Sequence, residues 1–159
     1  MLRVGIGYDV HRFANGAPRK LVLGGVAVDG EQGLDGHSDA DVVVHAIMDA
    51  LLGAAALGDI GVHFSPDDAQ YKNIDSCVLL ARVVALLREG GRRIGNIDTV
   101  IVAERPRLAT YVPLMREKLA SICRIDAGSV SVKATTEEGL GLAGKGIAAH
   151  CICTIVKDV

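Results

Sequence analysis

Aromatic residues are scarce in this chain, whose 159 residues include three Tyr, two Phe and no Trp. Clustered basic residues are missing as well, and the formal net charge is −2. A nucleic-acid-binding protein usually gathers Lys and Arg on one surface and places aromatic side chains among them to stack on bases. The composition therefore predicts a protein that does not bind nucleic acid.

Long uninterrupted apolar runs are also absent. The longest strongly apolar stretch, residues 42–57, is broken by His45, Asp49 and Gly53. A membrane-spanning helix needs about 20 predominantly apolar residues, so this stretch predicts a buried helix instead. The first residues lead straight into an apolar, strand-like run without the layout of a signal peptide. We expect a cytoplasmic protein with no membrane segment.

Several common motifs are missing. No two cysteines have C-x-x-C spacing, and we expect the four to be buried, reduced thiols. No G-x-x-x-x-G-K-[ST] run occurs, and Gly5-Ile6-Gly7 lacks the third glycine and the following helix of a dinucleotide-binding turn. The sequence therefore supports neither a P-loop nor a dinucleotide fold. The cysteines are Cys77, Cys123, Cys151 and Cys153.

Half of the chain is apolar, mostly as Ala, Val, Leu and Ile. Its length suits one domain over residues 1–159, with no linker or repeat to divide it. So much apolar surface on a short chain favours burial between subunits, and we expect a homo-oligomer.

Alternating and helical patterns predict an α+β fold: a mixed sheet of about four main strands with helices packed on one face. A Ser38-x-x-Asp41 capping pattern predicts a helix that starts there and runs to about Leu57. Between that helix and the next, residues 59–75 are expected to form a polar loop. Strands are expected over 2–8, 20–23, 26–29, 97–103, 130–134 and 147–156, and further helices over 76–89 and 110–122.

One carboxylate and two imidazoles stand out as metal ligands. Asp9 and His11 lie two residues apart on an expected strand and so point to the same face, and His45 follows within the expected helix. Three such ligands suit a catalytic zinc, which keeps one coordination position open. The alternative is a pair of ordinary histidines near a turn. Asp41 and Asp49, one turn either side of His45, could orient its ring or simply be solvated.

Two further segments could bind phosphate. His37 and Ser38 stand at the expected helix start, where free N–H groups favour an anion, although Ser38 could serve only as a cap. After the strand at 130–134, Thr135, Thr136 and Glu138 offer hydroxyls and a carboxylate for phosphate and a hard cation, although a simple turn would explain them too.

Four motifs then occur in order along the chain. They are Gly7-Tyr8-Asp9-Val10-His11, Gly36–Asp41, Asp49–Gly61 and Val132-Lys133-Ala134-Thr135-Thr136. In these motifs and their spacing, essentially end to end, the chain resembles the 2-C-methyl-D-erythritol 2,4-cyclodiphosphate synthase family of the non-mevalonate isoprenoid pathway.

The resemblance implies a metal-dependent, cyclising phosphorus–oxygen lyase. Its substrate would be 4-diphosphocytidyl-2-C-methyl-D-erythritol 2-phosphate, converted to 2-C-methyl-D-erythritol 2,4-cyclodiphosphate with release of CMP. Zinc would be held by Asp9, His11 and His45, and Glu138 would hold a second ion, Mg²⁺ or Mn²⁺, on the substrate diphosphate. The enzyme would be a homotrimer with its active sites between subunits.

The resemblance also implies roles for segments of the substrate site. Catalytic positions are His37 and Thr136, which would stabilise the transition state. The segment 59–61 would bind the erythritol part, the loop beginning at Phe64 would close over it, and backbone groups of 103–109 would bind cytidine. The implied substrate-binding residues are Asp9, His11, His37, Ser38, Asp59, Ile60, Gly61, Phe64, Asp68, Ala103, Arg107, Leu108, Ala109, Thr135, Thr136, Leu142 and Lys145.

Two other functions compete with this interpretation. A zinc hydrolase would use metal-bound water, but it leaves residues 135–138 unexplained. A non-catalytic trimeric ligand-binding module would close its metal site with a fourth ligand, for which His63 and His150 are the candidates.

Overall fold

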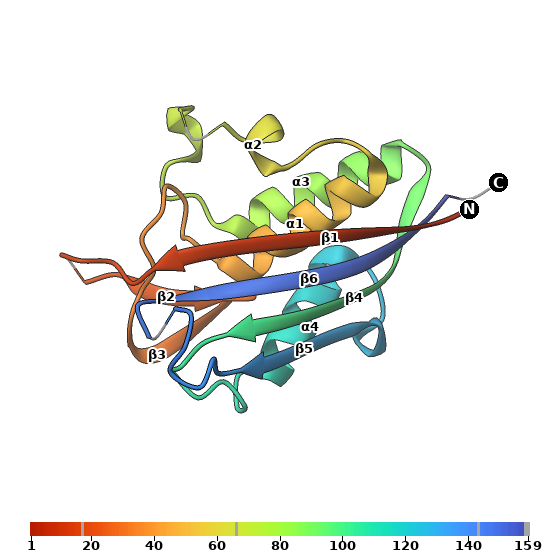
Figure 1. Cartoon of the computed structure of the whole chain (residues 1–159). Coiled ribbons are helices and arrows are strands. Elements are labelled where there is room, and N and C mark those ends of the chain that lie inside the picture. The colour runs from red at the N-terminus through yellow and green to blue at the C-terminus, as the bar shows by residue number, and fades with distance from the viewer. Residues whose placement is uncertain (17, 66, 143, 158–159) are drawn as a thin grey trace.

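The computed structural model describes residues 1–16, 18–65, 67–142 and 144–157. Its main sheet has the strand order β1-β6-β4-β5 (Figure 1). Strand β6 pairs antiparallel with both β1 and β4, while β4 and β5 pair in parallel, so the sheet is mixed. A separate hairpin joins β2 to β3. The bounds are β1 Leu2–Arg12, β2 Lys20–Leu23, β3 Val26–Gln32, β4 Arg92–Val102, β5 Val130–Thr135 and β6 Gly146–Lys157.

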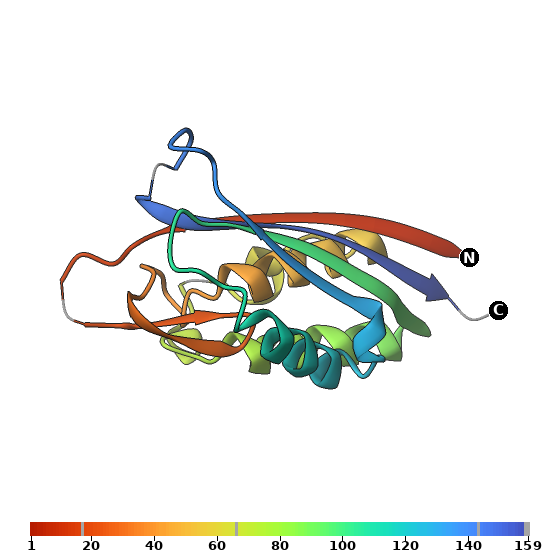
Figure 2. The ribbon, with the colours of Figure 1, turned by 90° about the horizontal axis from the view of Figure 1, so that it is seen from below.

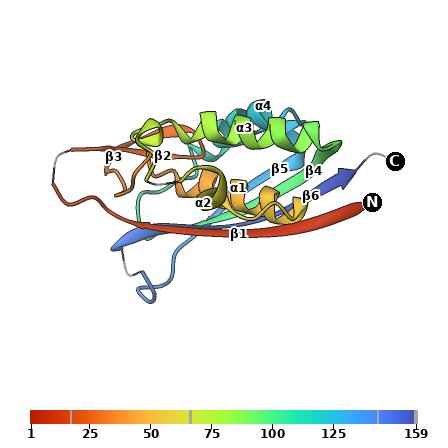
Figure 3. The same ribbon diagram turned by 90° about the horizontal axis from the view of Figure 1, so that it is seen from above.

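Three long helices cover one face of the main sheet, and they lie in a layer beside it in both edge views (Figures 2 and 3). Helix α1 is buried almost throughout and packs directly on β1 and β6. This arrangement confirms the predicted α+β class and the predicted single covered face. The helices are α1 Val42–Ala55, α2 Ile60–His63, α3 Ser76–Glu89 and α4 Val112–Cys123, with 3₁₀ turns η1 Ala69–Tyr71 and η2 Ala127–Ser129.

Two glycines allow α1 to lie directly on β1. A Cβ at Gly5 would collide with the backbone of Ala50, and one at Gly7 with the backbone of Ala46. Any larger residue would push the helix away from the strand, because backbone atoms cannot move aside as a flexible side chain can. The Gly5-Ile6-Gly7 run therefore sets the distance between β1 and the helix that carries His45.

The predicted helix start at Ser38 was wrong. Helix α1 begins at Val42, and its cap is Asp41, whose carboxylate accepts hydrogen bonds from the N–H groups of Val43 and Val44. Ser38 instead accepts a hydrogen bond from Ala40 in the segment before the helix. A Ser-x-x-Asp pattern holds two capping residues, and tertiary contacts decided which one is used.

The other elements were predicted at the right places, but several of their boundaries differ. Strands β1, β3 and β4 are longer than expected, because pairing with a neighbouring strand continues past the apolar core residues. Strand β4 starts at Arg92, directly after the Gly90-Gly91 turn, and crosses an irregularity between Ile94 and Asn96. The expected polar loop at 59–75 contains the short helix α2 and the turn η1.

The uncovered face of β1 is apolar. Leu2, Val4, Ile6, Tyr8 and Val10 are all exposed, with Ile6 at 71%. They alternate with Gly5 and Gly7, which face α1, as strand geometry requires. A row of exposed aliphatic side chains is unusual on a soluble monomer and is typical of an interface.

Two predictions about composition can be checked directly. All four cysteines are free and buried, as expected. Burial raises the pKa of Cys77, Cys123 and Cys153 to about 12, which keeps these thiols protonated and unreactive. Over the described ranges, every helix is too short or too polar to cross a bilayer.

Candidate metal centre

The three predicted metal ligands meet at one point beneath the sheet. Asp9 and His11 come from the α1-facing side of β1, and His45 rises from the first turn of α1. Asp9 Oδ2 lies 2.9 Å from His45 Nδ1 and 3.1 Å from His11 Nε2. One ligand atom from each residue falls within 4.8 Å of the other two, a spacing that can hold a metal ion. The shared face predicted for Asp9 and His11 is thus confirmed.

Hydrogen bonds at the far side of each ring determine which nitrogen faces the centre. His11 Nδ1 lies 2.5 Å from the carbonyl oxygen of Asp35, which can only accept, so Nδ1 keeps its proton when the ring is neutral, and Nε2 is then the nitrogen that can bind a metal. His45 is turned the other way: its Nε2 lies 2.9 Å from Ser76 Oγ and 3.1 Å from Ser38 Oγ. Its Nδ1 is then the nitrogen that faces Asp9. Such partners are what metal-bound imidazoles require.

Ser76 is the main partner of His45. The residue is fully buried at the start of α3. Its hydroxyl makes a short hydrogen bond to Asp39 Oδ1, and its N–H donates to Asp39 Oδ2 at 3.0 Å. Because the carboxylate can only accept, the hydroxyl proton points to Asp39, and the oxygen lone pair is left to accept from His45. Asp39, Ser76 and His45 therefore form one hydrogen-bonded chain that ends at the metal centre.

Sequence reasoning missed these hydrogen bonds and left open whether Asp41 and Asp49 orient the His45 ring or are simply solvated; both carboxylates instead bind backbone N–H groups. The Asp41 carboxylate accepts from the N–H groups of Gly24 and Gly25, besides capping α1, and so fastens the β2–β3 hairpin to the helix. Asp49 accepts from the N–H of Ile60 at 2.8 Å and holds α2. Ser76 stands 31 residues from His45 in the sequence, and no local pattern links the two.

The electrostatics of the centre favour cation binding. Burial raises the pKa of Asp9, but hydrogen bonds with His11 and His45 and the charges of those rings outweigh it, so the pKa ends well below its usual value. Asp9 is therefore an ionised ligand at neutral pH. The pKa of His11 is raised, chiefly by its hydrogen bond to Asp9 and against the opposing effect of burial.

A cavity of about 290 Å³ opens beside the three ligands. Apolar side chains such as Met48 and Leu79 line it along with the predicted residues. Met48 stands about one helical turn after His45, and this spacing could have identified it as a cavity-lining residue. Outside its lining but close by, the carbonyl oxygen of Asp68 lies 3.4 Å from His37 Nε2, and Asp59 caps α2. The predicted residues that the structure brings into this cavity are Asp9, His11, His37, Ser38, His45, Ile60, Gly61 and Phe64.

The remaining predicted residues gather elsewhere, around the C-terminal ends of β4 and β5. The N–H of Ala103 donates to the carbonyl of Thr135 at 2.9 Å, and the Thr136 hydroxyl donates to Glu138 Oε1 at 3.0 Å. None of this group lines the metal cavity. Strands β1 and β5 form opposite edges of the sheet, three strand spacings or about 14 Å apart. Within one chain, the segment 135–138, which was predicted to bind phosphate, therefore lies apart from the metal ligands.

Leu142 and Lys145 line a small cavity of about 240 Å³ that also touches His11. The candidate fourth ligands do not reach the centre. His63 Nε2 lies 2.9 Å from the carbonyl of Leu57, and the His150 ring stacks on Tyr8 with centroids 4.6 Å apart. Among the described residues, the metal group consists of Asp9, His11 and His45 alone.

His37 and Ser38 were predicted to bind an anion because they were expected at the start of a helix, and that expected position was wrong. Helix α1 begins four residues after Ser38, and the Asp41 carboxylate occupies its first free N–H groups. Ser38 is 8% exposed, and its hydroxyl lies 3.1 Å from the ring of His45. Ser38 therefore contacts the metal ligand and also lines the cavity.

The sequence profile of the YgbB family matches residues 2–156. The chain belongs to the YgbB family. Similar curated members are 2-C-methyl-D-erythritol 2,4-cyclodiphosphate synthases. That of Clostridium kluyveri is 55% identical over 160 residues, covering 99% of this chain and 96% of the relative. That of Syntrophomonas wolfei is 56% identical over 156 residues, covering 97% and 98%.

Solved structures similar to this YgbB-family chain show the same architecture. A 2C-methyl-D-erythritol-2,4-cyclodiphosphate synthase in a CDP-bound form has a TM-score of 0.89 at 30% identity, covering 97% of this chain and 100% of that one. The bifunctional IspDF of Campylobacter jejuni has a TM-score of 0.92 at 38% identity. The match covers 98% of this chain but 42% of that longer protein.

Proposed function

We propose that this YgbB-family chain is a 2-C-methyl-D-erythritol 2,4-cyclodiphosphate synthase, acting in the cytoplasm as a single domain over residues 1–159. It converts 4-diphosphocytidyl-2-C-methyl-D-erythritol 2-phosphate to the cyclic diphosphate and releases CMP. The observation that carries this function is the full-length similarity to curated synthases together with the Asp9, His11 and His45 cluster beside a cavity.

The reaction needs little acid–base chemistry from the protein. An oxygen of the substrate's own 2-phosphate, already anionic at neutral pH, attacks the β-phosphorus of the diphosphate. The bond from that phosphorus to the bridging oxygen breaks, and CMP leaves with the α-phosphate. Positioning and charge neutralisation are then the main tasks, as in phosphoryl transfer generally.

Zinc is the ion that this donor set fits, because two imidazole nitrogens and one carboxylate oxygen leave a coordination position free. When bound, zinc neutralises and polarises a substrate phosphate oxygen as a Lewis acid. Asp9, His11 and His45 hold the ion, while Ser76 and the Asp35 carbonyl keep the two rings turned toward it.

We assign His37, which lines the cavity, to donate a hydrogen bond to a phosphate oxygen as charge develops there. Ile60 and Gly61, held by Asp49 through α2, contact the erythritol part. Phe64 and Tyr71, whose rings meet edge to face at 5.5 Å, form an apolar wall that excludes water.

We assign the nucleotide end of the substrate to the second group of residues. Thr135, Thr136 and Glu138 bind the diphosphate with Mg²⁺ or Mn²⁺, and backbone groups of 103–109 bind cytosine. This group stands about 14 Å from the metal ligands within one chain, and we infer that a second copy supplies it to the complete site. The apolar outer face of β1 supports a trimer in which neighbours complete each other's sites.

The direct test is incubation of the zinc-loaded protein with the cytidyl substrate and Mg²⁺, followed by ³¹P NMR. CMP and a cyclic diphosphate should appear in equal amounts. Free inorganic phosphate would indicate a hydrolase instead, and absence of turnover would contradict the proposed activity.

His45→Ala should abolish stoichiometric zinc binding, because it removes one of three ligands and the one held most firmly by buried partners. Zinc content by atomic emission checks this. His63→Ala, which removes a histidine outside the cluster, should retain the wild-type content. Unchanged zinc in His45→Ala would contradict the assigned site.

A further inference from the structure

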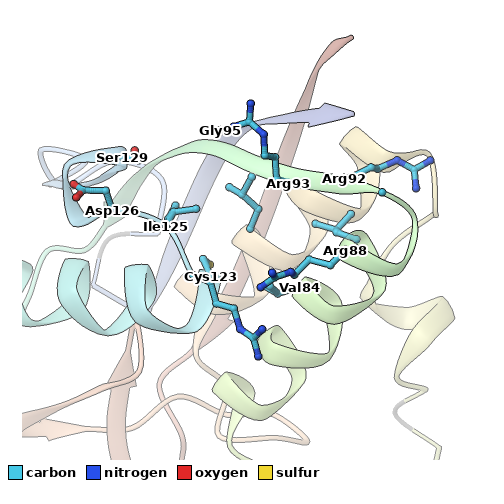
Figure 4. A pocket seen from close by; sticks show the side chains of 13 residues that line it. Val84, Arg88, Arg92, Arg93, Gly95, Cys123, Ile125, Asp126 and Ser129 are labelled. Carbon is cyan, nitrogen blue, oxygen red and sulfur yellow. The ribbon is translucent and has the colours of Figure 1, made fainter. Parts of the chain in front are cut away.

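A cavity of about 520 Å³ lies far from the metal centre, where α3 and α4 end and β4 begins (Figure 4). Three segments remote in sequence form it, namely residues 84–88, 91–95 and 123–129. In the sheet, Ala149 of β6 pairs with Asp9 of β1 on one side and with Ile101 of β4 on the other, so Asp9 and Ile101 lie at the same level. Arg92, at the cavity, lies nine residues before Ile101 on β4. The two sites are therefore about 30 Å apart along the sheet.

Arginine residues line this cavity. Arg88 comes from the last turn of α3, Arg92 from the first residue of β4, and Arg124 from the C-cap of α4. Within the described ranges, none of the three makes an ion pair or a side-chain hydrogen bond. Figure 4 shows Arg88 reaching across the cavity toward Cys123, and Arg93 pointing from the other face of the strand, away from the helices.

Helix C-termini alone could explain basic residues here, because the carbonyl end of a helix carries about half a negative charge. Both α3 and α4 end at this cavity, which contributes about −1 in total, and Asp126 adds −1. The four lining arginines, Arg88, Arg92, Arg93 and Arg124, carry +4 in total, so positive charge exceeds negative charge around the cavity. Asp126 is also occupied, since its carboxylate accepts from the N–H of Gly128 at 2.6 Å.

The inner wall of the cavity is apolar. Val84, Leu87 and Ile94 line it and are at most 6% exposed, and Cys123 lies beside them. Figure 4 also shows Ser129 near the opposite wall, where its hydroxyl can donate a hydrogen bond. Cationic groups at the rim and an apolar wall inside suit a ligand with one anionic and one apolar end.

We propose that this cavity binds a small organic phosphate, a monoester whose phosphate is held by Arg88 and Arg124 and whose apolar part packs on Leu87 and Ile94. Guanidinium groups match phosphate oxygens in charge and in planar, two-point geometry. The site is separate from the proposed catalytic centre and shares no lining residue with its cavity.

Residue-resolved NMR tests the proposal on the zinc-loaded protein. Phenyl phosphate and inorganic phosphate are titrated separately, and amide shifts of Gly91, Gly95 and Ser129 report on this cavity, while Gly61 reports on the metal cavity. Both probes should give saturable shifts at the first three amides, with phenyl phosphate binding several-fold more tightly because only it reaches the apolar wall.

The Arg88→Gln/Arg124→Gln double variant should raise the phenyl phosphate Kd at Gly91 and Gly95 at least about tenfold, since two charge-assisted contacts are lost. The matched control is Lys118→Gln, which removes one charge from α4 outside the cavity. It should leave the Kd unchanged, and both variants should keep the wild-type response at Gly61. Shifts confined to Gly61, equal affinity for the two probes, or an unchanged Kd in the double variant would each overturn the proposal.

Discussion

Ser76 has no contact with substrate in the proposed mechanism, yet its hydroxyl determines how a metal ligand is presented. It accepts from His45 Nε2 because its own proton is directed to Asp39. Without that acceptor, the His45 ring could place its proton on Nδ1, the nitrogen that must bind the metal.

Ser76→Ala should therefore weaken zinc binding by about tenfold, the lower end of effects seen when a partner of a metal-bound imidazole is removed. Competition with a chromophoric chelator measures the Kd, and Co²⁺ substitution reports the ligand geometry spectroscopically. Ser121→Ala, an exposed serine on α4, is the control and should bind zinc as the wild type does. Equal affinities would show that His45 is oriented without Ser76.

His11 gives the centre a defined pH dependence. Its pKa is raised by Asp9 in the metal-free site, and only the neutral ring can bind a metal. As the pH falls through this raised pKa, protons compete with the metal. The zinc Kd should then rise by up to about tenfold per pH unit for this one proton, starting above the ordinary histidine value of 6.5. Chelator competition from pH 8.5 to 5.5 checks this, and a flat profile would contradict it.

At the scale of elements, the contact between β1 and α1 controls the metal centre, because Asp9 and His11 lie on one element and His45 on the other. Gly7 permits their close approach. Gly7→Ala should lower the free energy of unfolding by about 1–3 kcal/mol, the usual cost of overpacking, and should also weaken zinc binding by displacing α1.

Gly53→Ala is the matched control for that change. Gly53 is an exposed position within α1, where an added methyl group would meet nothing closer than 3.9 Å. The substitution should stabilise the protein by up to about 1 kcal/mol, because alanine favours the helix. Urea denaturation of both variants measures the difference. Equal stabilities would mean that the close approach at Gly7 does not limit the packing.

For the whole molecule, the exposed apolar row on β1 is the strongest sign of assembly. Ile6→Asp should disrupt the proposed trimer, because it places a charge at the centre of that row. Light scattering should give about 50 kDa for the wild type, three times 16.6 kDa, and a smaller mass for the variant. Leu114→Asp, at an exposed leucine of α4, should keep the larger mass. A wild-type protein of 16.6 kDa would contradict the proposed assembly.

Local pattern was sufficient for much of this molecule. Alternation along β1 placed Asp9 and His11 on one face, and helical periodicity placed His45 on a buried helix, so the sequence identified the three residues that the structure brings together as a candidate metal site. The α+β class followed from the same two periodicities. Boundaries were less accurate, because strand pairing extended β4 back to Arg92 and because Asp41 displaced Ser38 as the cap of α1.

Residue types and their spacing therefore specified the elements, the covered face of β1 and the donor atoms of the metal centre, since these depend on backbone geometry within a few residues. The partners of those donors were decided only by packing. Ser76 reaches His45 because α3 lies against α1, and the arginine-lined cavity exists because two helix ends meet the start of β4. Hydrogen bonds and cavities of this kind depend on distances between elements, which no local pattern encodes.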